Sequence, residues 1–509
     1  MKFNVPNIFN NKTTNYEGAV AYKMSTEMEL YSAVVTASLN DQFYEKESDR
    51  LKRIQSLIAK SNPEIVAKMA IYTREKMYLR SVPMVMAVEM AKHASGNGLV
   101  AKTVERVVQR ADEISEVLAY YAMANGRKEQ KQLNKLSKQV QKGLAASFNK
   151  FDEYQFAKYN RDGAVKLKDA LFLVHPKAKD EAQQVLFNKI VKDELTVPYT
   201  WETELSALGQ QTFESEKAKK LAVKAKWEEL IDSKKLGYMA MLRNMRNMLE
   251  AEIDAEHVVK VCTQLASEEA VKKSKQLPFR FLAAYRELKQ INSGFVPMIL
   301  DALEEALKAS VANMRGFGVD TKVVIACDVS SSMQKPVSPR SKVLYYDISL
   351  LMGMMLQYKC KNVLSGMFGD RWKVVQMPTR NILANVDAFY KREGEVGYST
   401  NGYLVLDYLI KAGYVADKVM MFTDVQMYDS VSGNTLIGNT VAAKWKAYKK
   451  IAPNAKLYLF DLAGLGKLPL EIKDNDVYLI AGWSDKIFDV LNALDEGGNA
   501  MTEIEKIVI

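Results

Sequence analysis

The stretch Val323-Val-Ile-Ala-Cys-Asp-Val-Ser-Ser-Ser332 holds a short apolar run followed by the pattern Asp-x-Ser-x-Ser. An apolar run of this length between polar residues predicts a buried strand. After it, short apolar runs alternate with helical segments, which favours a parallel sheet covered by helices on both faces. We expect strands at 322–327, 361–368, 373–377, 418–423, 456–462 and 476–481, and helices at 341–358, 402–412, 438–449 and 485–495.

Oxygen-bearing side chains follow the predicted strands. Asp328, Ser330 and Ser332 follow the first strand, Thr400 lies in a polar loop, and Asp424 ends another apolar run. Open α/β sheets assemble ligands at the carboxyl ends of their strands, and Mg²⁺ prefers oxygen ligands. We therefore predict a site for Mg²⁺, or for Mn²⁺ or Ca²⁺, in which the hydroxyls bind directly and the carboxylates bind directly or through water. The alternative is that Asp328 and Ser330 merely cap the following helix.

The region from residue 26 to about 310 is predicted to be helical throughout. Asn62 is a plausible N-cap before Pro63, and apolar residues at helical spacing follow. Many short amphipathic helices without a fixed-period repeat indicate a solenoid of helix pairs. Further helices are expected at 101–124, 130–147, 181–194, 216–232, 237–250, 255–268 and 295–313.

Positive charge is concentrated in one segment. The chain has a net charge of +10, and residues 127–179 alone contain 13 lysines and arginines but 5 aspartates and glutamates, a net of +8. Concentrated positive charge is typical of a polyanion site, and the alternative is a set of solvated helix faces.

Individual basic residues in and near this segment are candidate phosphate contacts. Four lysines with spacings of four, three and four are expected on one helix face: Lys131, Lys135, Lys138 and Lys142. The other candidates are Arg161, Lys166, Lys168, His175, Lys177, Arg74 and Arg80. For the last two, pairing with Glu64 or Glu75 is the alternative. Nearby Phe172 could stack on a base, although such aromatics more often belong to the core.

Composition excludes several classes of protein. With 509 residues, two or three domains are expected. There is no apolar run of 18 residues and no apolar signal core, so we expect no membrane contact and a cytoplasmic protein. Three widely spaced cysteines fit a reducing compartment. No phosphate-binding loop or nucleophile motif occurs, so we expect no enzyme, and a metal-dependent nuclease is the catalytic alternative.

Residues from about 320 onward resemble a von Willebrand factor A domain. Asp328, Ser330, Ser332, Thr400 and Asp424 match the metal-ion-dependent adhesion site of that family. Asn401 departs from the pattern, since related sequences often carry aspartate there. The resemblance implies a Rossmann-like fold with a bound divalent cation.

Several helical stretches resemble the TROVE module of the Ro autoantigen and its bacterial orthologues. The matching stretches are Thr73–Arg80 with Pro83, Tyr159–Gly163 continuing to Lys166–Asp169, Leu171–Lys177, Trp201-Glu202, Leu236–Asn247 and Leu277–Tyr285. Near the C-terminus, Gly482–Phe488 also resembles the Ro pattern. The resemblance implies that HEAT-like helical repeats form a ring. It also implies binding of small noncoding Y-like RNA on a basic outer surface and of single-stranded 3′ ends of misfolded or structured RNA in the hole. Such proteins act in RNA quality control or processing, sometimes with an exoribonuclease such as polynucleotide phosphorylase.

The expected organisation is therefore an all-α helical-repeat ring followed by an α/β domain. We place an N-terminal segment at 1–25, the helical RNA-binding module at 26–312, a linker at 313–320 and the A domain at 321–509, with a C-terminal tail that could pack on the ring. The protein is expected to be monomeric within an RNA complex. The competing hypothesis is a protein-binding scaffold in which the A domain captures a partner through Mg²⁺.

Overall fold

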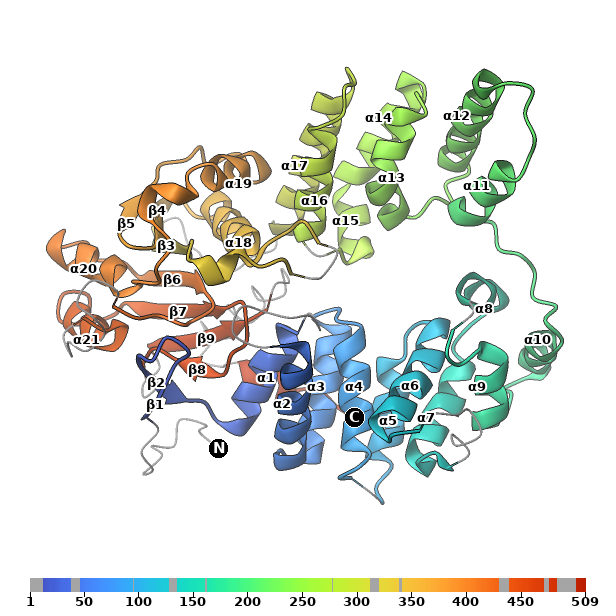
Figure 1. Ribbon diagram of the computed structural model, residues 1–509, viewed down its shortest axis with the longest axis horizontal. Helices are drawn as coiled ribbons and strands as arrows, with labels where there is room; N and C mark the ends of the chain where they lie inside the picture. The colour runs from blue at the N-terminus through green and yellow to red at the C-terminus, as the bar shows by residue number, and fades with distance from the viewer. Residues whose placement is uncertain are drawn as a thin grey trace. The chain divides into compact units, whose positions relative to one another are not determined.

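The chain folds into two compact units. The computed structural model describes residues 12–37, 46–94, 96–127, 135–160, 163–276, 278–311, 320–337, 341–429, 439–470, 476–482 and 500–509. The helical unit comprises Arg53–Leu236 and Ile504–Ile509, and the mixed unit comprises Met1–Lys52 and Gly237–Glu503. Figure 1 colours the chain from blue at its N-terminus to red at its C-terminus.

The helical unit is a succession of short helices in which each packs mainly on helices close to it in sequence. This is the arrangement expected of a solenoid of helix pairs. Its helices appear in blue to green in Figure 1. They are the C-terminal part of α2 (Glu47–Lys60), α3 (Pro63–Glu75), α4 (Ser81–Met90), α5 (Leu99–Val107), α6 (Ala111–Ala124), α7 (Lys138–Phe148), α8 (Glu153–Tyr159), α9 (Leu167–Val174), α10 (Glu181–Lys192), α11 (Trp201–Gly209) and α12 (Glu216–Asp232).

Local signals account for some helix ends and not for others. The Asn62 side chain accepts a hydrogen bond from the Glu64 N–H at 2.9 Å, as predicted for the start of α3. The single helix predicted at 101–124 is wrong, because α5 ends at Val107 and α6 begins at Ala111. The break is stabilised by the Glu113 carboxylate, which accepts hydrogen bonds from the backbone N–H groups of residues 109 and 110.

Close packing of α5 on α7 depends on Gly143. A Cβ atom at this position would lie 2.5 Å from the backbone oxygen of Ala101 and 2.7 Å from the Val104 Cβ. Contacts this short force a shift of one helix, so only glycine permits the observed approach. The packing of α5 on α7 in turn sets the position of the residues that α7 exposes.

The mixed unit contains a six-stranded sheet with the order β5-β4-β3-β6-β7-β9. All neighbouring strands are parallel except β5, which runs antiparallel to β4. The strands are β3 (Lys322–Asp328), β4 (Asn362–Phe368), β5 (Trp372–Val374), β6 (Lys418–Thr423), β7 (Lys456–Asp461) and β9 (Val477–Ala481). The helices around it are α18 (Tyr345–Lys359), α19 (Leu383–Tyr390), α20 (Tyr403–Lys411) and α21 (Val441–Tyr448).

Helices cover both faces of this sheet, as expected for buried parallel strands. On one face, Val324 and Ala326 belong to a core that includes side chains of α20 and α21. On the other face, Ile325 and Cys327 lie against α18. A Cβ atom added to Gly353 of this helix would lie 3.0 Å from the Cys327 Sγ. The predicted fold class, a helical-repeat module followed by an α/β domain, is confirmed. Sequence patterns did not indicate α19.

Residues near the N-terminus form a second, three-stranded sheet with a strand from the far end of the chain. Its order is β1-β2-β8, with β1 at Lys12–Thr14, β2 at Val20–Lys23 and β8 at Lys467–Leu468. Helix α1 (Thr26–Val35) follows. The described part of the expected N-terminal segment 1–25 is therefore built into the mixed unit.

Besides α1, five later helices of the expected module 26–312 belong to the mixed unit, which resumes at residue 237. Arg286 donates a hydrogen bond to Asp347 of α18 at 2.6 Å, and Glu304 accepts from the Ile382 and Ala384 N–H groups at the start of α19. Ion pairing and helix capping thus join these helices to the α/β domain. The five are α13 (Tyr238–Glu250), α14 (Ala255–Ala266), α15 (Glu268–Ser274), α16 (Phe279–Leu288) and α17 (Val296–Val311).

Parts of the predicted structure fall outside the described residues. They are the helix at 485–495, most of the linker at 313–320 and the first residues of the helix at 130–147. In the portion of the chain that the structure describes, no helix is long and apolar enough to cross a membrane.

Candidate metal site and basic surface

Asp328 closes β3, and two donors fix its carboxylate. The Thr423 hydroxyl donates to Oδ2 at 2.6 Å and the Ser330 N–H donates to Oδ1 at 2.9 Å. Thr423 ends β6, which pairs with β3. Asp328 has no exposed surface. Parallel pairing of the two strands therefore places this carboxylate at the carboxyl edge of the sheet, as predicted.

The two serines of the Asp-x-Ser-x-Ser pattern face each other. Their Oγ atoms are 3.1 Å apart, and both side chains are buried. Ser330 precedes a short 3₁₀ helix at Ser331–Gln334, but its side chain makes no capping hydrogen bond. The helix-cap alternative therefore does not account for the Ser330 hydroxyl, which is directed to Ser332 instead.

Asp424 lies in the loop after β6 and is also buried. Its Oδ1 accepts a hydrogen bond from the Gln426 N–H at 3.1 Å, and the Ser332 hydroxyl donates to the same carboxylate. Burial raises the pKa of Asp328 to about 6. Burial, together with the negative charge of Asp328, raises the pKa of Asp424 to about 7. The negative charge of Asp461 also raises the pKa of Asp424, so a cation bound here would relieve repulsion among these carboxylates.

The loop that carries Thr400 joins the other two loops. The Ser331 N–H donates to the Tyr398 oxygen at 3.0 Å, and the Tyr428 N–H donates to the Thr400 oxygen at 3.2 Å. Thr400 is buried. The next residue, Asn401, donates from its side chain to the Gly369 oxygen at 3.1 Å. An ionised aspartate could not donate this bond. The bond therefore gives a structural reason for asparagine at position 401, where related sequences often carry aspartate.

The five predicted ligands thus lie on three loops that contact one another at one edge of the sheet. Three neutral hydroxyls and two carboxylates suit a hard divalent cation such as Mg²⁺, which commonly keeps water ligands. Among the residues that the structure describes, no group of three His, Cys, Asp or Glu side chains is arranged to hold a metal. The residues present fit a single hydroxyl-rich cation site.

The basic residues of the predicted polyanion site gather on α7, α9 and the turn after α9. The Gln141 side chain donates to the Leu173 oxygen at 3.2 Å, which joins the two helices. Asn149, at the end of α7, donates to the Lys177 oxygen at 2.8 Å and accepts from the Lys179 N–H at 3.0 Å. These bonds hold the turn after α9 against the end of α7.

We call this region the α7–α9 surface. Its exposed basic side chains are Lys138, Lys142, Lys166, His175 and Lys177. Lys168 is half-buried and pairs with Asp193 at 3.1 Å. Phe172 is 52% exposed, whereas an aromatic residue at such a position more often belongs to the core.

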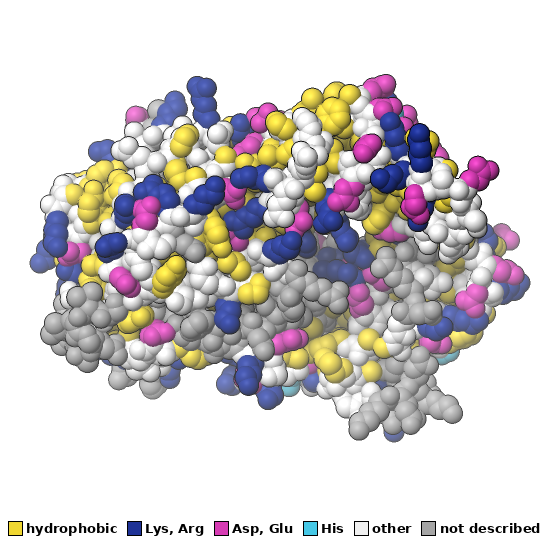
Figure 2. Space-filling view, turned by 45° about the horizontal axis from the view of Figure 1, so that its top comes forward, with side chains coloured by type: hydrophobic (Ala, Val, Ile, Leu, Met, Phe, Trp, Pro, Cys, Tyr) yellow, Lys and Arg dark blue, Asp and Glu magenta, His cyan; other side chains and the backbone are white. Residues whose placement is uncertain are grey.

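The predicted lysine stripe is only partly realised on a helix. Helix α7 begins at Lys138, so Lys135 precedes it and cannot share its face, although Lys135 is exposed. Lys131 and Arg161 lie outside the described residues. On the face shown in Figure 2, Lys and Arg side chains are interspersed with Asp and Glu.

Arg74, a candidate phosphate contact, is bound to a carboxylate inside the helical unit. Its side chain is buried and donates two hydrogen bonds to Glu113, at 2.7 and 2.8 Å. Arg80 is partly exposed and bonds to Glu113, to Asp112 at 2.8 Å and to Glu116. Neither arginine pairs with Glu64 or Glu75, the partners considered from sequence. Both guanidinium groups instead bind carboxylates of α6, which no local pattern indicated.

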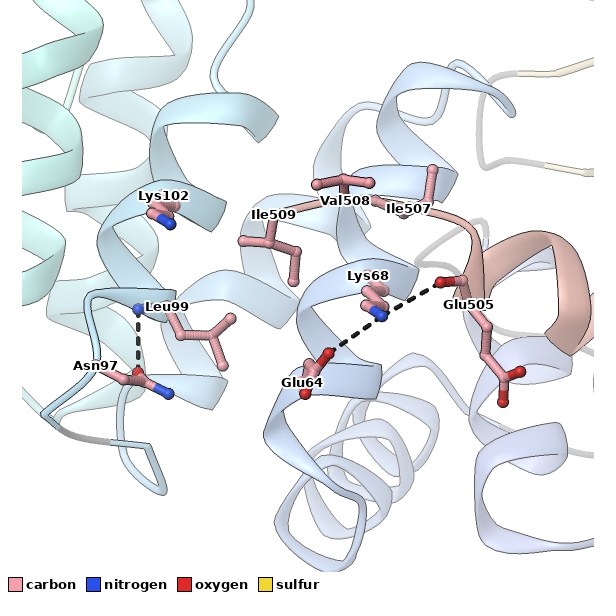
Figure 3. A pocket seen from close by; sticks show the side chains of 9 residues that line it. All are labelled: Glu64, Lys68, Asn97, Leu99, Lys102, Glu505, Ile507, Val508 and Ile509. Atoms are coloured by element: carbon pink, nitrogen blue, oxygen red, sulfur yellow. Dashed lines mark hydrogen bonds and ion pairs between the residues drawn. The ribbon is translucent and has the colours of Figure 1, made fainter. Parts of the chain in front are cut away.

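A cavity of about 370 Å³ in the helical unit is lined by the last residues of the chain (Figure 3). The Lys68 Nζ lies 3.1 Å from the Glu64 carboxylate and donates to the Glu505 backbone oxygen at 3.2 Å. Arg106 donates to the Val508 oxygen. The tail Ile504–Ile509 is thus held by its main chain against α3 and α5. None of the predicted site residues lines this cavity.

Comparison with known proteins agrees with the helical architecture. A model of the TROVE domain matches residues 20–207 and 194–295, which together span more than half of the chain. The chain belongs to the TROVE domain family. Family membership supports an RNA-binding role in a ribonucleoprotein.

The fold of this TROVE protein is similar to the crystal structure of the Deinococcus radiodurans RO (RSR) protein. The TM-score is 0.59, with 93% of this chain and 100% of that chain covered. At 16% sequence identity, this likeness concerns the fold alone.

Two curated relatives carry the name Telomerase protein component 1. The protein from Rattus norvegicus is 24% identical over 322 residues, which are 48% of this chain and 12% of that protein. The protein from Mus musculus is 41% identical over 96 residues, which are 19% of this chain and 3% of that protein. The TROVE chain therefore spans only a small part of the length of these relatives.

Proposed function

We propose that this protein binds a small noncoding RNA of the Y type through the α7–α9 surface. The observation that carries the proposal is the exposure of Lys138, Lys142, His175 and Lys177 on elements that hydrogen bonds hold together. Lysines that neutralise phosphates release condensed counterions, so such binding weakens steeply with salt. Exposed Phe172 adds an aromatic face on which an unpaired base can stack.

The rest of the proposed role follows from the resemblance to Ro proteins. The helical repeats form a ring whose hole takes single-stranded 3′ ends of misfolded or structured RNA. The protein acts in RNA quality control or processing in the cytoplasm, as a monomer within the RNA complex, and it presents RNA to an exoribonuclease such as polynucleotide phosphorylase. It performs no catalysis itself.

Gel shifts at two salt concentrations test RNA binding. The probe is a structured RNA with a single-stranded 3′ tail. The variant is Lys138→Ala/Lys142→Ala/Lys177→Ala, and the matched control replaces three exposed lysines of α12, Lys217, Lys219 and Lys220, with alanine.

The slope of log affinity against log salt should fall by roughly 0.7 to 0.9 for each phosphate that is no longer neutralised, or by about two to three in the α7–α9 variant. The α12 control should retain the wild-type slope. Absence of binding by the wild type would refute the proposal, and equally weakened binding in both variants would place the RNA elsewhere.

We further propose that Asp328, Ser330, Ser332, Thr400 and Asp424 hold one divalent cation, Mg²⁺ or alternatively Mn²⁺ or Ca²⁺. The support is that three loops place these buried oxygens at one edge of the sheet, where burial raises the pKa of both carboxyl groups. The cation would offer a coordination position to a carboxylate of a partner protein, and this protein-capture role is the second candidate function.

Titration calorimetry on chelator-treated protein tests the cation site. One Mg²⁺ should bind per chain, and Asp328→Asn should abolish binding, since a neutral amide replaces a charged ligand. An Asp328→Asn variant that binds Mg²⁺ as the wild type does would contradict the proposed site.

A further inference from the structure

The turn of the β1–β2 hairpin lies directly on the loop that carries Asp424. The Asn15 side chain donates from Nδ2 to the Met427 oxygen at 2.8 Å, and the Tyr16 N–H donates to the Gln426 Oε1 at 3.0 Å. Asn15 is 6% exposed and Gln426 is fully buried. Two residues near the N-terminus are thus bonded to a loop about 400 residues later in the chain.

Asn15 uses the two ends of its amide for two different tasks. Its Oδ1 accepts from the Glu17 N–H at 3.0 Å and from the Ala19 N–H at 2.9 Å, which shapes the hairpin turn. Its Nδ2 reaches the metal-site loop. The turn itself is supported elsewhere, because β2 pairs with β8 and the Lys467 Nζ lies 4.3 Å from the centre of the Tyr16 ring. The hairpin is therefore a fixed support.

The loop that it contacts needs such a support. Val425, a β-branched residue, has a φ of +58°, a conformation that such residues adopt only under strain. Its N–H donates to the Thr423 hydroxyl at 3.0 Å, and the next N–H, of Gln426, donates to the Asp424 Oδ1 at 3.1 Å. The orientation of the Asp424 carboxylate thus depends on a strained backbone that neighbouring contacts must hold.

The same loop also contacts the loop of Thr400. The Tyr428 N–H donates to the Thr400 oxygen. Met427 packs against Gly402, where a Cβ atom would lie 2.4 Å from the Met427 Sδ. Anchoring the Met427 backbone therefore fixes one loop that carries a carboxylate and a second loop that carries a hydroxyl.

We infer that Asn15 is a positioning residue for the cation site, and that the hairpin holds the Asp424 and Thr400 loops in the geometry that binds the ion. This inference rests on the cation site proposed above. Asn15 acts through its hydrogen bond to the Met427 oxygen, and its neighbour Tyr16 adds a bond from its N–H to Gln426. Residues from the beginning of the chain thereby belong to the frame of a site whose ligands lie in its last third.

Mg²⁺ binding by three variants tests the inference. Asn15→Ser keeps an oxygen that can accept from the turn but does not reach Met427, and Asn15→Ala loses both functions. The matched control is Thr14→Ala, an exposed neighbour in β1. Loss of one neutral hydrogen bond predicts an increase of about two- to tenfold in the Kd for Mg²⁺ in Asn15→Ser. The Tm in EDTA is measured in parallel and should show that each variant is still folded at the temperature of the binding assay.

The outcomes separate this inference from the proposal on which it rests. No Mg²⁺ binding by the wild type refutes the cation site. Wild-type affinity in Asn15→Ser and Asn15→Ala overturns the positioning role and leaves the cation site intact.

Amide hydrogen exchange on the wild type needs no variant. Mg²⁺ should protect both residues 424–428 and the turn at 15–19, and protection confined to 424–428 would overturn the inference.

Discussion

Replacing Glu113 with alanine should destabilise the helical unit by about 3–5 kcal/mol. Glu113 has no exposed surface and accepts two hydrogen bonds from the buried Arg74 guanidinium and two more from backbone N–H groups between α5 and α6. Alanine would leave a buried positive charge without its partner. It would also leave two amides without an acceptor, each of which typically costs about 1–3 kcal/mol.

Urea unfolding measures this effect. Glu116→Ala is the control, because Glu116 bonds to the partly exposed Arg80 and is itself 43% exposed, so its loss should cost less than about 1 kcal/mol. Arg74→Met combined with Glu113→Leu should recover only the part of the loss that comes from the unpaired buried charge, since the two backbone amides still lack an acceptor. Equal urea midpoints for Glu113→Ala and Glu116→Ala would refute the reasoning.

Three further predictions concern other parts of the chain. In EDTA, the Tm measured by calorimetry should fall as pH rises from about 4 to about 7, because the folded state holds protons on Asp328 and Asp424 that the unfolded state releases. Mg²⁺ should reduce this fall in Tm. A Tm that does not change with pH would contradict the raised pKa values of the two buried carboxyl groups. Gly143→Ala should lower stability by about 1–3 kcal/mol in urea, because its Cβ meets the backbone of α5, whereas Gly209→Ala, with open space around it, should not. Glu304→Gln should cost more than the roughly 0.3–1 kcal/mol of the lost charge at the start of α19, because its single amide oxygen can accept from only one of the two N–H groups. Glu304→Ala should cost more still, because both N–H groups lose their acceptor, and equal thermal shifts would exclude the capping role.

Local chemistry in the sequence indicated the parts of the fold that depend on near neighbours. The cap at Asn62 involves residues two positions apart, and the strand before Asp328 is a contiguous apolar run, so both were predicted from sequence. The end of α5 could not be predicted in this way, because 101–124 has an uninterrupted helical pattern. The break depends on Glu113, whose carboxylate is fully buried beside Arg74.

The candidate sites divide in the same way. The residues of the proposed cation site could be predicted, because they lie after strands and this fold class brings the carboxyl ends of its strands together. For Arg74 the sequence indicated either a phosphate or a nearby glutamate as the partner, because the observed partner, Glu113, lies 39 residues away on another helix. No pattern could indicate Asn15, which reads as an ordinary turn residue in the sequence and meets Met427, 412 positions later, only in the folded chain.

Pairing between the hairpin and strand β8 has a consequence for synthesis. At roughly 5–20 residues per second, the ribosome needs about 20–80 s to advance from Asn15 to the loop that Asn15 binds. During that interval the hairpin has no partner strand, and a two-stranded hairpin alone is marginally stable in water. The α/β domain must then close a very long loop, a step that slows folding and exposes unpaired strand edges. Nascent chains stalled before β8 should therefore depend on chaperones more than the completed protein does.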